Sequence, residues 1–437
     1  MAKKGKKTTP IPENMPVIHP HAAGIDVGAE EHWVCVPADR DAQPIQKLSA
    51  FTCDLHRLAD WFTTCRVTTV AMESTGVYWM PLFQILEARG FAVALVNARH
   101  VKHVPGRPKT DRFDCRWLQK LHSYGLLAPS FRPPEDMCQF RSLLRHRDNL
   151  VHLSVKHIQH MQKSLDQMHL HLHHVMSDVT GVTGMRILRA IVAGERDPRT
   201  FAKSRDYRMK SSEDTIAKAL EGDYRPEQVF TLTQSLALYD FTQQQIAACD
   251  QEIERVLDTF DSLVDLDAHP LPPPTTAHRQ PQRNAPAFDL RAHLYRITGV
   301  DLTQVPGLQA LTIHTVLSEV GLDMSTWPTD KHCASWLGLC PDNRISGGTV
   351  LATGSRPVQN RASRALRMAA QSLRTSPSSL GAFHRRMRST LGPAKATTAT
   401  AHTLAKILSH MLKEKTPYRE RGADYYMYKD QERKLRQ

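Results

Sequence analysis

The sequence predicts a chain of three parts: an α/β domain, a helical middle region and a mainly helical C-terminal domain. Three observations lead to this prediction. Short apolar runs alternate with helical stretches up to about residue 125, a seven-residue apolar repeat follows at 226–260, and a proline-rich segment at 262–290 precedes the last part. At 437 residues the chain is long enough for two or three domains, each with its own core.

The first domain, predicted over 21–130, begins with three short strands and continues with strands separated by helices. Strands are expected at 22–27, 32–37, 45–51, 67–73 and 91–96, and helices at 54–64, 78–89 and from about 111. The first three strands are close enough in sequence for a meander, whereas the later ones need helical crossovers. We therefore expect a mixed sheet flanked by helices, preceded by a disordered basic tail at 1–20.

The middle region, predicted over 131–261, opens with a histidine-rich helix expected at 134–176. Pairs such as His169 and His173, or His157 and His160, have a helical spacing that would suit a metal ion. No Cys or carboxylate set accompanies them, and partly protonated histidines along a helix can equally meet nucleic-acid phosphate. The metal interpretation is therefore the less favoured one.

The apolar repeat at 226–260 predicts a coiled coil of about five heptads. Two polar residues, Gln243 and Asp250, interrupt its seam and would fix the register. The seam has two available partners, the 134–176 helix of the same chain or another subunit. Because the linker at 262–290 also gives the C-terminal domain reach, we expect a homodimer or homotetramer with exchanged domains. The apolar residues are Leu232, Tyr239, Ile246, Ile253 and Phe260, with Val229, Leu236 and Leu257 between them.

The net charge of +13 lies at the C-terminal end of the chain. Residues 351–437 contain 18 Lys or Arg against 5 Asp or Glu, which leaves 1–350 balanced. Such a surface predicts a polyanionic partner, although a solvated basic helix face is the alternative. Nucleic acid is favoured over a membrane because the sequence has no long apolar span and no signal-peptide pattern, so we expect a cytoplasmic, nucleoid-associated protein. Eight cysteines without a CxxC pair are expected to be reduced, buried thiols.

Four acidic residues of the first domain are the candidate metal ligands. Asp26 and Glu73 end two apolar strands, while Asp111 and Asp114 share one face at the start of a helix. An acid at a helix start is usually only a cap or a favourable charge. Four carboxylates brought together, however, repel one another unless they share cations. Mg²⁺ or Mn²⁺, which prefer oxygen ligands, is the expected cofactor.

The C-terminal domain, predicted over 291–437, contains the candidate nucleophile, Ser346. A serine followed by two glycines is by itself usually a turn residue. Upstream, the turn at 305–308 resembles half of a helix-hairpin-helix, whose backbone N–H groups can meet phosphate, but an ordinary helix-turn-helix connection fits nearly as well. The residues around the serine that suit phosphate are Arg344, Gly347 and Gly348, with Arg361, Arg364 and Arg367 on the helix that follows.

Together these motifs resemble the DEDD transposases of bacterial insertion sequences. The resemblance covers roughly 1–130 and 300–420, and it implies an RNase-H-like first domain similar to the RuvC Holliday-junction nuclease. Two positions depart from the family pattern, because Cys115 stands in place of an alanine and Gln359 in place of a glycine. The motifs that carry the resemblance are Glu-Ser-Thr-Gly-Val-Tyr at 73–78, Lys-Thr-Asp-Arg-Phe-Asp at 109–114, the serine-glycine loop, Asn360 to Arg367, Ala394-Lys395-Ala396 and Pro417-Tyr418.

The resemblance implies a DNA recombinase in which Ser346 becomes covalently joined to DNA. It further implies that Asp26, Glu73, Asp111 and Asp114 hold the metal, and that the serine domain of one subunit completes the metal domain of another. A structured bridge RNA that pairs with donor and target DNA is the implied guide. The residues expected to contact nucleic acid are Lys109, Arg112, Arg344, Gly347, Gly348, Arg361, Arg364 and Arg367.

The chemistry of serine is compatible with the recombinase interpretation and also with other functions. A serine hydroxyl is a poor nucleophile unless a base or metal assists it, and no histidine lies within a few residues of Ser346. Two alternatives stay open: a RuvC-like metal nuclease or resolvase that uses water, with Ser346 only structural, and a non-catalytic DNA-binding protein whose acids stabilise the fold. Substitution of Ser346 separates the two enzymes, and metal dependence separates both from the binding protein.

Overall fold

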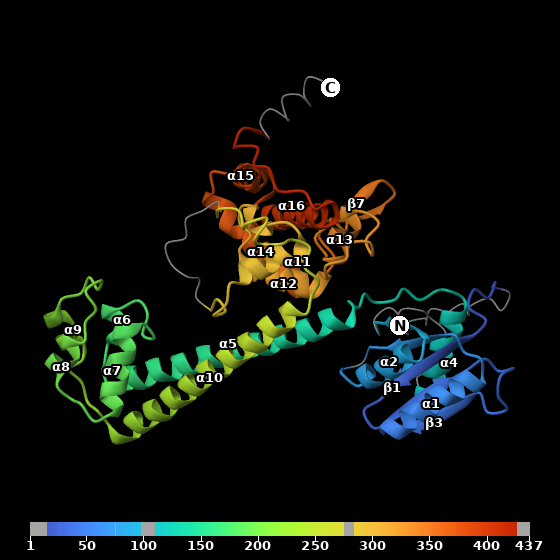
Figure 1. Ribbon diagram of the computed structural model, residues 1–437, viewed down its shortest axis with the longest axis horizontal. Helices are drawn as coiled ribbons and strands as arrows, with labels where there is room; N and C mark the ends of the chain where they lie inside the picture. Colours follow the sequence, from blue (N-terminus) through green and yellow to red (C-terminus); the bar gives the residue numbers. More distant parts are fainter. Residues whose placement is uncertain (1–14, 75, 98–109, 275–283, 426–437) are drawn as a thin grey trace, which may run out of the picture. The chain divides into compact units, whose positions relative to one another are not determined.

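A computed structural model of the protein describes residues 15–74, 76–97, 110–274 and 284–425 (Figure 1). The chain forms two compact units, Met1–Arg132 and Pro133–Gln437. Most of the tail predicted at 1–20 lies outside the described residues. Among the helices that are described, none combines the length and the apolar character needed to cross a membrane.

The N-terminal unit is built on a mixed sheet, which has five strands in the described residues, in the order β3-β2-β1-β4-β5. Strands β1 to β3 form an antiparallel meander, whereas β4 and β5 continue parallel to β1. The mixed α/β sheet predicted from the sequence is confirmed. The strands are β1 (Ala22–Val27), β2 (Glu31–Cys35), β3 (Ile45–Ser49), β4 (Thr69–Glu73) and β5 (Ala92–Val96).

Helices cover both faces of this sheet because its strands alternate two sets of buried side chains. Ile25 and Met72 belong to the core beneath α1 (Thr52–Thr64) and α2 (Trp79–Ala88). On the other face, Val96 packs against the apolar side of α4 (Asp111–Ser123). The intervening residues of β1 and β4 therefore face α4.

The second unit contains two antiparallel helices of 33 residues each, α5 (Glu135–Gln167) and α10 (Pro226–Asp258), which lie side by side in Figure 1. The seam predicted on α10 thus packs on the histidine-rich helix of the same chain, one of the two partners that the sequence left open. Whether this packing has coiled-coil geometry stays a prediction. The histidine-rich helix ends at Gln167 rather than at 176, because His169 adopts a left-handed backbone conformation (φ 58°) that stops it.

Short helices connect the far ends of α5 and α10 and enclose a core of their own. Phe201, Ile187 and Ile216 are fully buried there, together with Met161 of α5 and Leu232 of α10. The sequence predicted a helical region here but not these separate elements. They are α6 (Leu172–Val175), α7 (Val182–Val192), α8 (Pro198–Lys203) and α9 (Glu213–Ala219).

The C-terminal part of the second unit is mainly helical, as predicted. Before it, the described part of the proline-rich segment is held in place, since Pro272 and Pro273 accept hydrogen bonds from Arg291 and Gln304. The helices are α11 (Leu290–Thr298), η1 (Leu302–Gln304), α12 (Ala310–Val320), α13 (Asp330–Trp336), α14 (Arg361–Ser372), η2 (Leu373–Thr375), α15 (Ser379–Leu391) and α16 (Pro393–Glu414), and two short strands, β6 (Arg344–Ser346) and β7 (Thr349–Ala352), precede α14.

All eight cysteines lie within the described residues and are free thiols. The prediction that they are buried is wrong for Cys53, which is exposed. Cys53 lies in the first turn of α1, and the buried side of that helix is formed instead by Leu55, Leu58 and Phe62. Cys138 and Cys340 are only half-buried.

Candidate active site

Asp26 and Glu73 lie at the same level and on the same face of the sheet. Strands β1 and β4 are parallel, and their register pairs Ile25 with Met72, so that the two acids follow at the next position of each strand. Because Ile25 and Met72 point into the core under α1 and α2, Asp26 and Glu73 point to the opposite face, which α4 covers. Both acids are half-buried.

Helix α4 runs antiparallel to β1 and crosses it at Gly24. Gln119 Nε2 donates a hydrogen bond to the carbonyl of Ala22 (3.3 Å). At Gly24, a Cβ atom would lie only 2.4 Å from the carbonyl oxygen of Cys115, so only glycine permits this approach. From this crossing, the four helix residues back from Cys115 to Asp111 and the two strand residues forward from Gly24 to Asp26 span similar lengths, about 6–7 Å. The first turn of α4, with Asp111 and Asp114, therefore reaches the level of Asp26.

The surroundings of Cys115 agree with this placement. Its pKa is raised, chiefly because its thiol shares a hydrogen bond with Cys35 and is buried, and also because the negative charge of Asp26 is near. Cys115 was one of the two departures from the family pattern. It is fully buried within α4, and its thiol donates a hydrogen bond to the carbonyl of Arg112 (3.3 Å), so the substitution leaves the helix intact.

The four carboxylates come from two strand ends and one helix start, as predicted, but they are not gathered into a ready-made ligand cluster. Within the ranges that the structure describes, no three His, Cys, Asp or Glu side chains form a group that could hold a metal ion. The described histidines of α5 and α6 likewise form no group of three that could hold a metal ion. The donor type nevertheless fits a hard divalent cation, because all four acids supply carboxylate oxygen. Asp111 is exposed and Asp114 half-buried.

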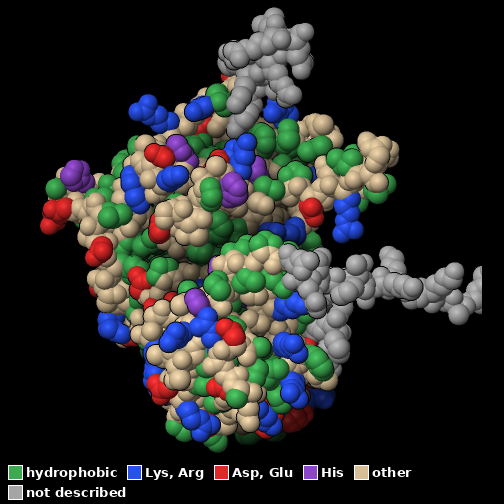
Figure 2. Space-filling view, turned by 90° about the vertical axis from the view of Figure 1, so that its right-hand side faces the viewer, with side chains coloured by type: hydrophobic (Ala, Val, Ile, Leu, Met, Phe, Trp, Pro, Cys, Tyr) green, Lys and Arg blue, Asp and Glu red, His purple; other side chains and the backbone are tan. Residues whose placement is uncertain are grey.

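The predicted nucleic-acid contacts beside these acids are only partly described. Arg112 is exposed in the first turn of α4. Lys109 falls in the segment 98–109, which lies outside the described residues. On the face drawn in Figure 2, Lys and Arg side chains are spread over the surface with Asp and Glu among them, rather than gathered into a single basic patch.

Ser346 is the last residue of β6, directly before the turn of a two-stranded hairpin. Gly347 and Gly348 form this turn with positive φ angles of 55° and 77°, the combination that a two-residue type I′ turn requires. Ser346 pairs with Thr349 across the hairpin, and every residue of both strands is exposed. The predicted serine loop is thus a β-hairpin that presents the serine to solvent. Ile345 is 63% exposed and Leu351 68%, although both are apolar.

The hairpin is held at its base by basic residues that sequence reasoning did not assign to it. Lys395 Nζ, in the first turn of α16, lies 3.5 Å from Thr353 Oγ1. Arg356 donates to the carbonyl of Ser335 (2.9 Å). The signal in the sequence was the Ala-Lys-Ala motif at 394–396, but its spatial relation to the hairpin was not visible there.

The three arginines of α14 have different surroundings. Arg361 forms an ion pair with Asp148 of α5 (2.8 Å), and Arg367 donates a hydrogen bond to the carbonyl of Gly338 (3.4 Å). Arg364 is exposed. Asn360 caps the helix through hydrogen bonds from the N–H groups of residues 362 and 363, so Gln359 in place of a glycine does not disturb the helix start.

The chain thus combines a mixed α/β sheet with acids at its strand ends and a mainly helical C-terminal part with an exposed serine hairpin. The family follows from two sequence models. The DEDD transposase model of IS110, described as a transposase, matches residues 23–170, and the model of the transposase IS116/IS110/IS902 family matches residues 301–385. The two matches cover more than half of the chain, which belongs to the IS110 family of DEDD transposases.

The resemblance noted in the sequence is therefore confirmed, and the protein is a DNA transposase. Membership of the DEDD class implies DNA binding and dependence on a divalent metal ion. A comparison with curated proteins gives no match.

Proposed function

We propose that this transposase cuts and rejoins DNA through an intermediate in which Ser346 Oγ is bonded to a DNA phosphate. The observation that carries the proposal is the exposed position of Ser346 at the tip of a hairpin, before two glycines that add no side chains beside it. A phosphodiester can approach such a hydroxyl without displacing protein atoms. Arg344, two residues away and also exposed, suits a phosphate oxygen.

Two successive ester exchanges describe the proposed reaction. Ser346 Oγ attacks the phosphorus of the scissile phosphodiester and gives up its proton, while the bond to the leaving nucleotide breaks and that nucleotide takes up a proton as a hydroxyl. In the second exchange a DNA hydroxyl attacks the serine phosphodiester and releases the serine. Each exchange makes one P–O bond and breaks one, so the recombination needs no nucleotide cofactor.

Asp26, Glu73, Asp111 and Asp114 are proposed to hold Mg²⁺ or Mn²⁺. Their support is the shared sheet face of Asp26 and Glu73, and the helix that brings Asp111 to the same level. A bound divalent ion supplies a lower proton affinity for a hydroxyl and neutralises charge on the phosphate. The half-buried position of Asp26 and Glu73 would keep their carboxylates oriented toward α4.

The nucleic-acid contacts are proposed to come from both units. Arg344 and Arg364 are exposed near the hairpin and on α14, whereas Arg361 and Arg367 would have to exchange their protein partners for phosphate. Gly347 and Gly348 would allow a DNA backbone to approach closely. Lys109 and Arg112 would serve the DNA beside the carboxylates.

A bridge RNA and a homodimer or homotetramer complete the proposal. The net charge of +13 suits a polyanionic partner, and RNA carries the same backbone phosphates as DNA. For assembly, the support is an exposed apolar strip on α10, since Phe230, Leu238 and Phe241 are 62%, 51% and 57% exposed although the helix already packs on α5.

A recombination assay separates the serine recombinase from a nuclease that uses water. Purified protein would be incubated with its element ends, target DNA and the element's transcript, and joined products would be counted by sequencing. We expect Ser346→Ala to abolish joined products while DNA binding remains. Ser355→Ala, at the base of the same hairpin, is the matched control and should recombine at the parental rate. Recombination by the Ser346→Ala variant would instead support the nuclease.

A further inference from the structure

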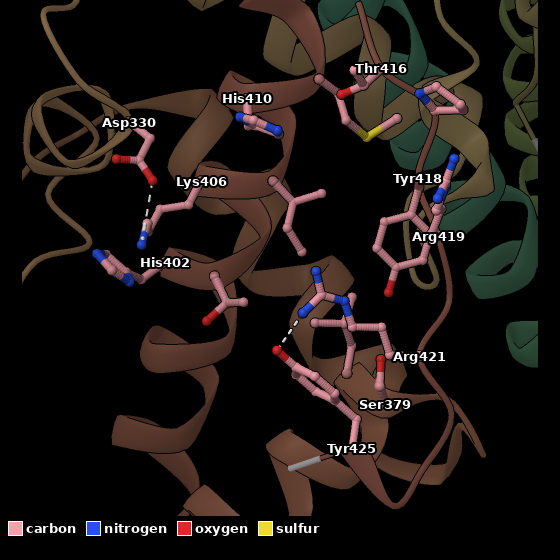
Figure 3. A pocket seen from close by; sticks show the side chains of 15 residues that line it. Asp330, Ser379, His402, Lys406, His410, Thr416, Tyr418, Arg419, Arg421 and Tyr425 are labelled. Carbon is pink, nitrogen blue, oxygen red and sulfur yellow. Dashed lines mark hydrogen bonds and ion pairs between the residues drawn. The ribbon is translucent and has the colours of Figure 1, made fainter. Parts of the chain in front are cut away.

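The C-terminal part contains a groove that the proposed recombination chemistry does not use. It lies between one side of α16 and residues 416–425, which fold back along that helix and are called the return segment here (Figure 3). Its volume is about 760 Å³, within the range of about 300–1,000 Å³ common for ligand sites. The groove residues that matter below are His402, Lys406, His410, Tyr418, Arg421 and Tyr425.

Three basic side chains of α16 line one wall of the groove. His402, Lys406 and His410 are spaced by four residues, which places them on one side of the helix. The opposite side of α16 is buried in the unit through residues such as Leu404 and Leu408. The pKa of His402 is lowered, first by burial and then by the positive charge of Lys406.

The return segment forms the other wall and is fixed by the carboxylate of Glu420. This carboxylate accepts hydrogen bonds from the N–H groups of Ser379 (2.9 Å) and Gly422 (3.0 Å) and from Tyr418 Oη (3.1 Å). Ser379 begins α15, and the N–H groups of a first helical turn have no partner within the helix, so a carboxylate is stabilised there. Tyr418 is therefore held in place at the wall.

Aromatic and cationic groups face the groove together. The guanidinium of Arg421 lies 4.7 Å from the ring centre of Tyr425 and donates a hydrogen bond to its hydroxyl. In Figure 3, Arg421 and Tyr418 reach toward the cavity from the return segment, opposite His410. Lys406 forms an ion pair with Asp330 (3.3 Å), whereas the Arg421 guanidinium lies against the ring of Tyr425.

This combination suits a nucleotide better than a phosphate alone. Tyrosine rings bind bases by stacking, and the adjacent cations bind the backbone phosphates, as in sites for single strands. A base within a duplex is already stacked between its neighbours and cannot lie against a tyrosine ring. The groove is therefore matched to a strand whose bases are unpaired.

The helix that lines the groove, α16, also contacts the base of the serine hairpin. Lys395, which contacts Thr353 of the hairpin base, and Lys406 in the groove are eleven residues apart on α16, which corresponds to about 16 Å along the helix axis. A strand in contact with the hairpin needs only a few nucleotides to reach the groove.

We propose that the groove between α16 and the return segment binds a nucleotide of single-stranded nucleic acid, with its base against Tyr418 and its phosphate on Arg421 and Lys406. This site goes beyond the proposed recombination chemistry because it involves neither Ser346 nor the four carboxylates. DNA and RNA share the base and phosphate groups that the groove recognises.

Photo-cross-linking of the full chain tests this site directly. The probes are a ten-residue oligothymidylate that contains 4-thiothymidine and the corresponding oligouridylate with 4-thiouridine, both without magnesium. We expect a cross-link on the tryptic peptide 416–419, which contains Tyr418, identified by mass spectrometry. Cross-linking by the deoxy probe, the ribo probe or both supports the site and tells which nucleic acid occupies it.

Matched variants are compared by their affinity for the single strand, measured by fluorescence anisotropy. Arg421→Gln removes an exposed charge and should weaken binding of the single strand about tenfold, and Tyr418→Leu should weaken it at least fivefold. Lys413→Gln removes a charge from the last turn of α16 outside the groove and should change binding less than twofold. Circular dichroism checks that each variant is folded. If Tyr418→Leu does not fold, the affinity of Arg421→Gln alone decides the test.

Three results would overturn the proposal: cross-links only outside the groove, parental affinity in both groove variants, or equal competition by a duplex of the same length. None of these measurements depends on cleavage. A failure here therefore differs from a failure of the serine mechanism, which would appear as unchanged recombination by Ser346→Ala.

Discussion

Gly24 determines how closely α4 approaches β1, and thereby where Asp111 and Asp114 lie relative to Asp26. The four acids were predictable from sequence because an acid after an apolar run marks a strand end, and two acids at 111 and 114 share a helix face. The role of Gly24 was not predictable, because it depends on a contact with Cys115 ninety-one positions along the chain. At this scale the sequence predicts the candidate groups, whereas the structure shows which contacts position them.

Replacing Gly24 by alanine should separate α4 from β1. The new Cβ would lie 2.3–2.4 Å from backbone atoms of Cys115 and Gln119, which cannot move aside as a flexible side chain would. We expect a loss of about 1–3 kcal/mol in the free energy of unfolding and strongly reduced DNA cleavage. Thermal denaturation measures the first effect. Gly354→Ala, where a Cβ meets nothing within 4 Å, should leave stability unchanged, and equal stability of the two variants would contradict the account.

Replacing Asp111 by asparagine tests the carboxylate site. The substitution keeps the shape of the side chain and removes its charge, so we expect cleavage to be lost while DNA affinity changes little. Cleavage of labelled element ends with and without added Mg²⁺ is the measurement, and Asp60→Asn on α1 is the control. Full activity of the Asp111→Asn variant would show that this carboxylate holds no essential metal.

Acid should destabilise the second unit through His314. Burial, together with the nearby charge of Arg147, lowers the pKa of His314 to about 3. When the pKa of a histidine is lower in the folded state than in the unfolded state, acid favours unfolding. The free energy of unfolding is then unaffected above about pH 6.5 and falls by up to about 1.4 kcal/mol for each pH unit below it. Unfolding free energies measured between pH 7 and pH 4 should fall less steeply for His314→Leu than for the parent. A parental slope would contradict this, and His146→Leu, an exposed histidine, serves as the control.

At the scale of elements, α10 illustrates what an apolar repeat reveals. Its heptad spacing predicted a long helix and two polar interruptions, but not the groups that those residues meet. Gln243 donates a hydrogen bond to Ser154 (2.8 Å), and Asp250 forms a buried ion pair with Arg147. Both partners lie on α5, so they give the two antiparallel helices one register. The left-handed turn at His169 was not predictable, because residues other than glycine rarely adopt it.

Removing one side of the buried ion pair should be costly. Arg147 and Asp250 are 5% and 4% exposed, so Asp250→Ala leaves a buried guanidinium without its carboxylate. We expect a loss of about 3–5 kcal/mol in the free energy of unfolding. Glu252→Ala, which breaks an exposed pair with Arg255 on the same helix, should cost less than about 1 kcal/mol. Similar denaturation curves for the two variants would exclude a structural role for the Arg147–Asp250 pair.

At the scale of the whole molecule, the family matches and the sequence predictions cover the same parts of the chain. The matches span 23–170 and 301–385, where the strand-end acids and the serine hairpin lie. The stretch between them holds the short helices α6 to α9, which the sequence did not resolve into elements because their core forms only when Phe201, Ile216 and Leu232 meet in space. Charge segregation toward the C-terminus was readable from composition alone, whereas the groove beside α16 was not.

The covalent link between Ser346 and DNA is the central claim, and one measurement tests it most directly. The protein would be incubated with element-end DNA and Mg²⁺, denatured, and digested with protease and nuclease, and the peptide that contains Ser346 would be analysed by mass spectrometry. We predict a nucleotide phosphate attached to Ser346, absent from Ser346→Ala and absent without the metal. The contradicting result has two parts. Ser346 would be unmodified at every time point of a reaction that forms recombination products, and Ser346→Ala would give the same yield of those products.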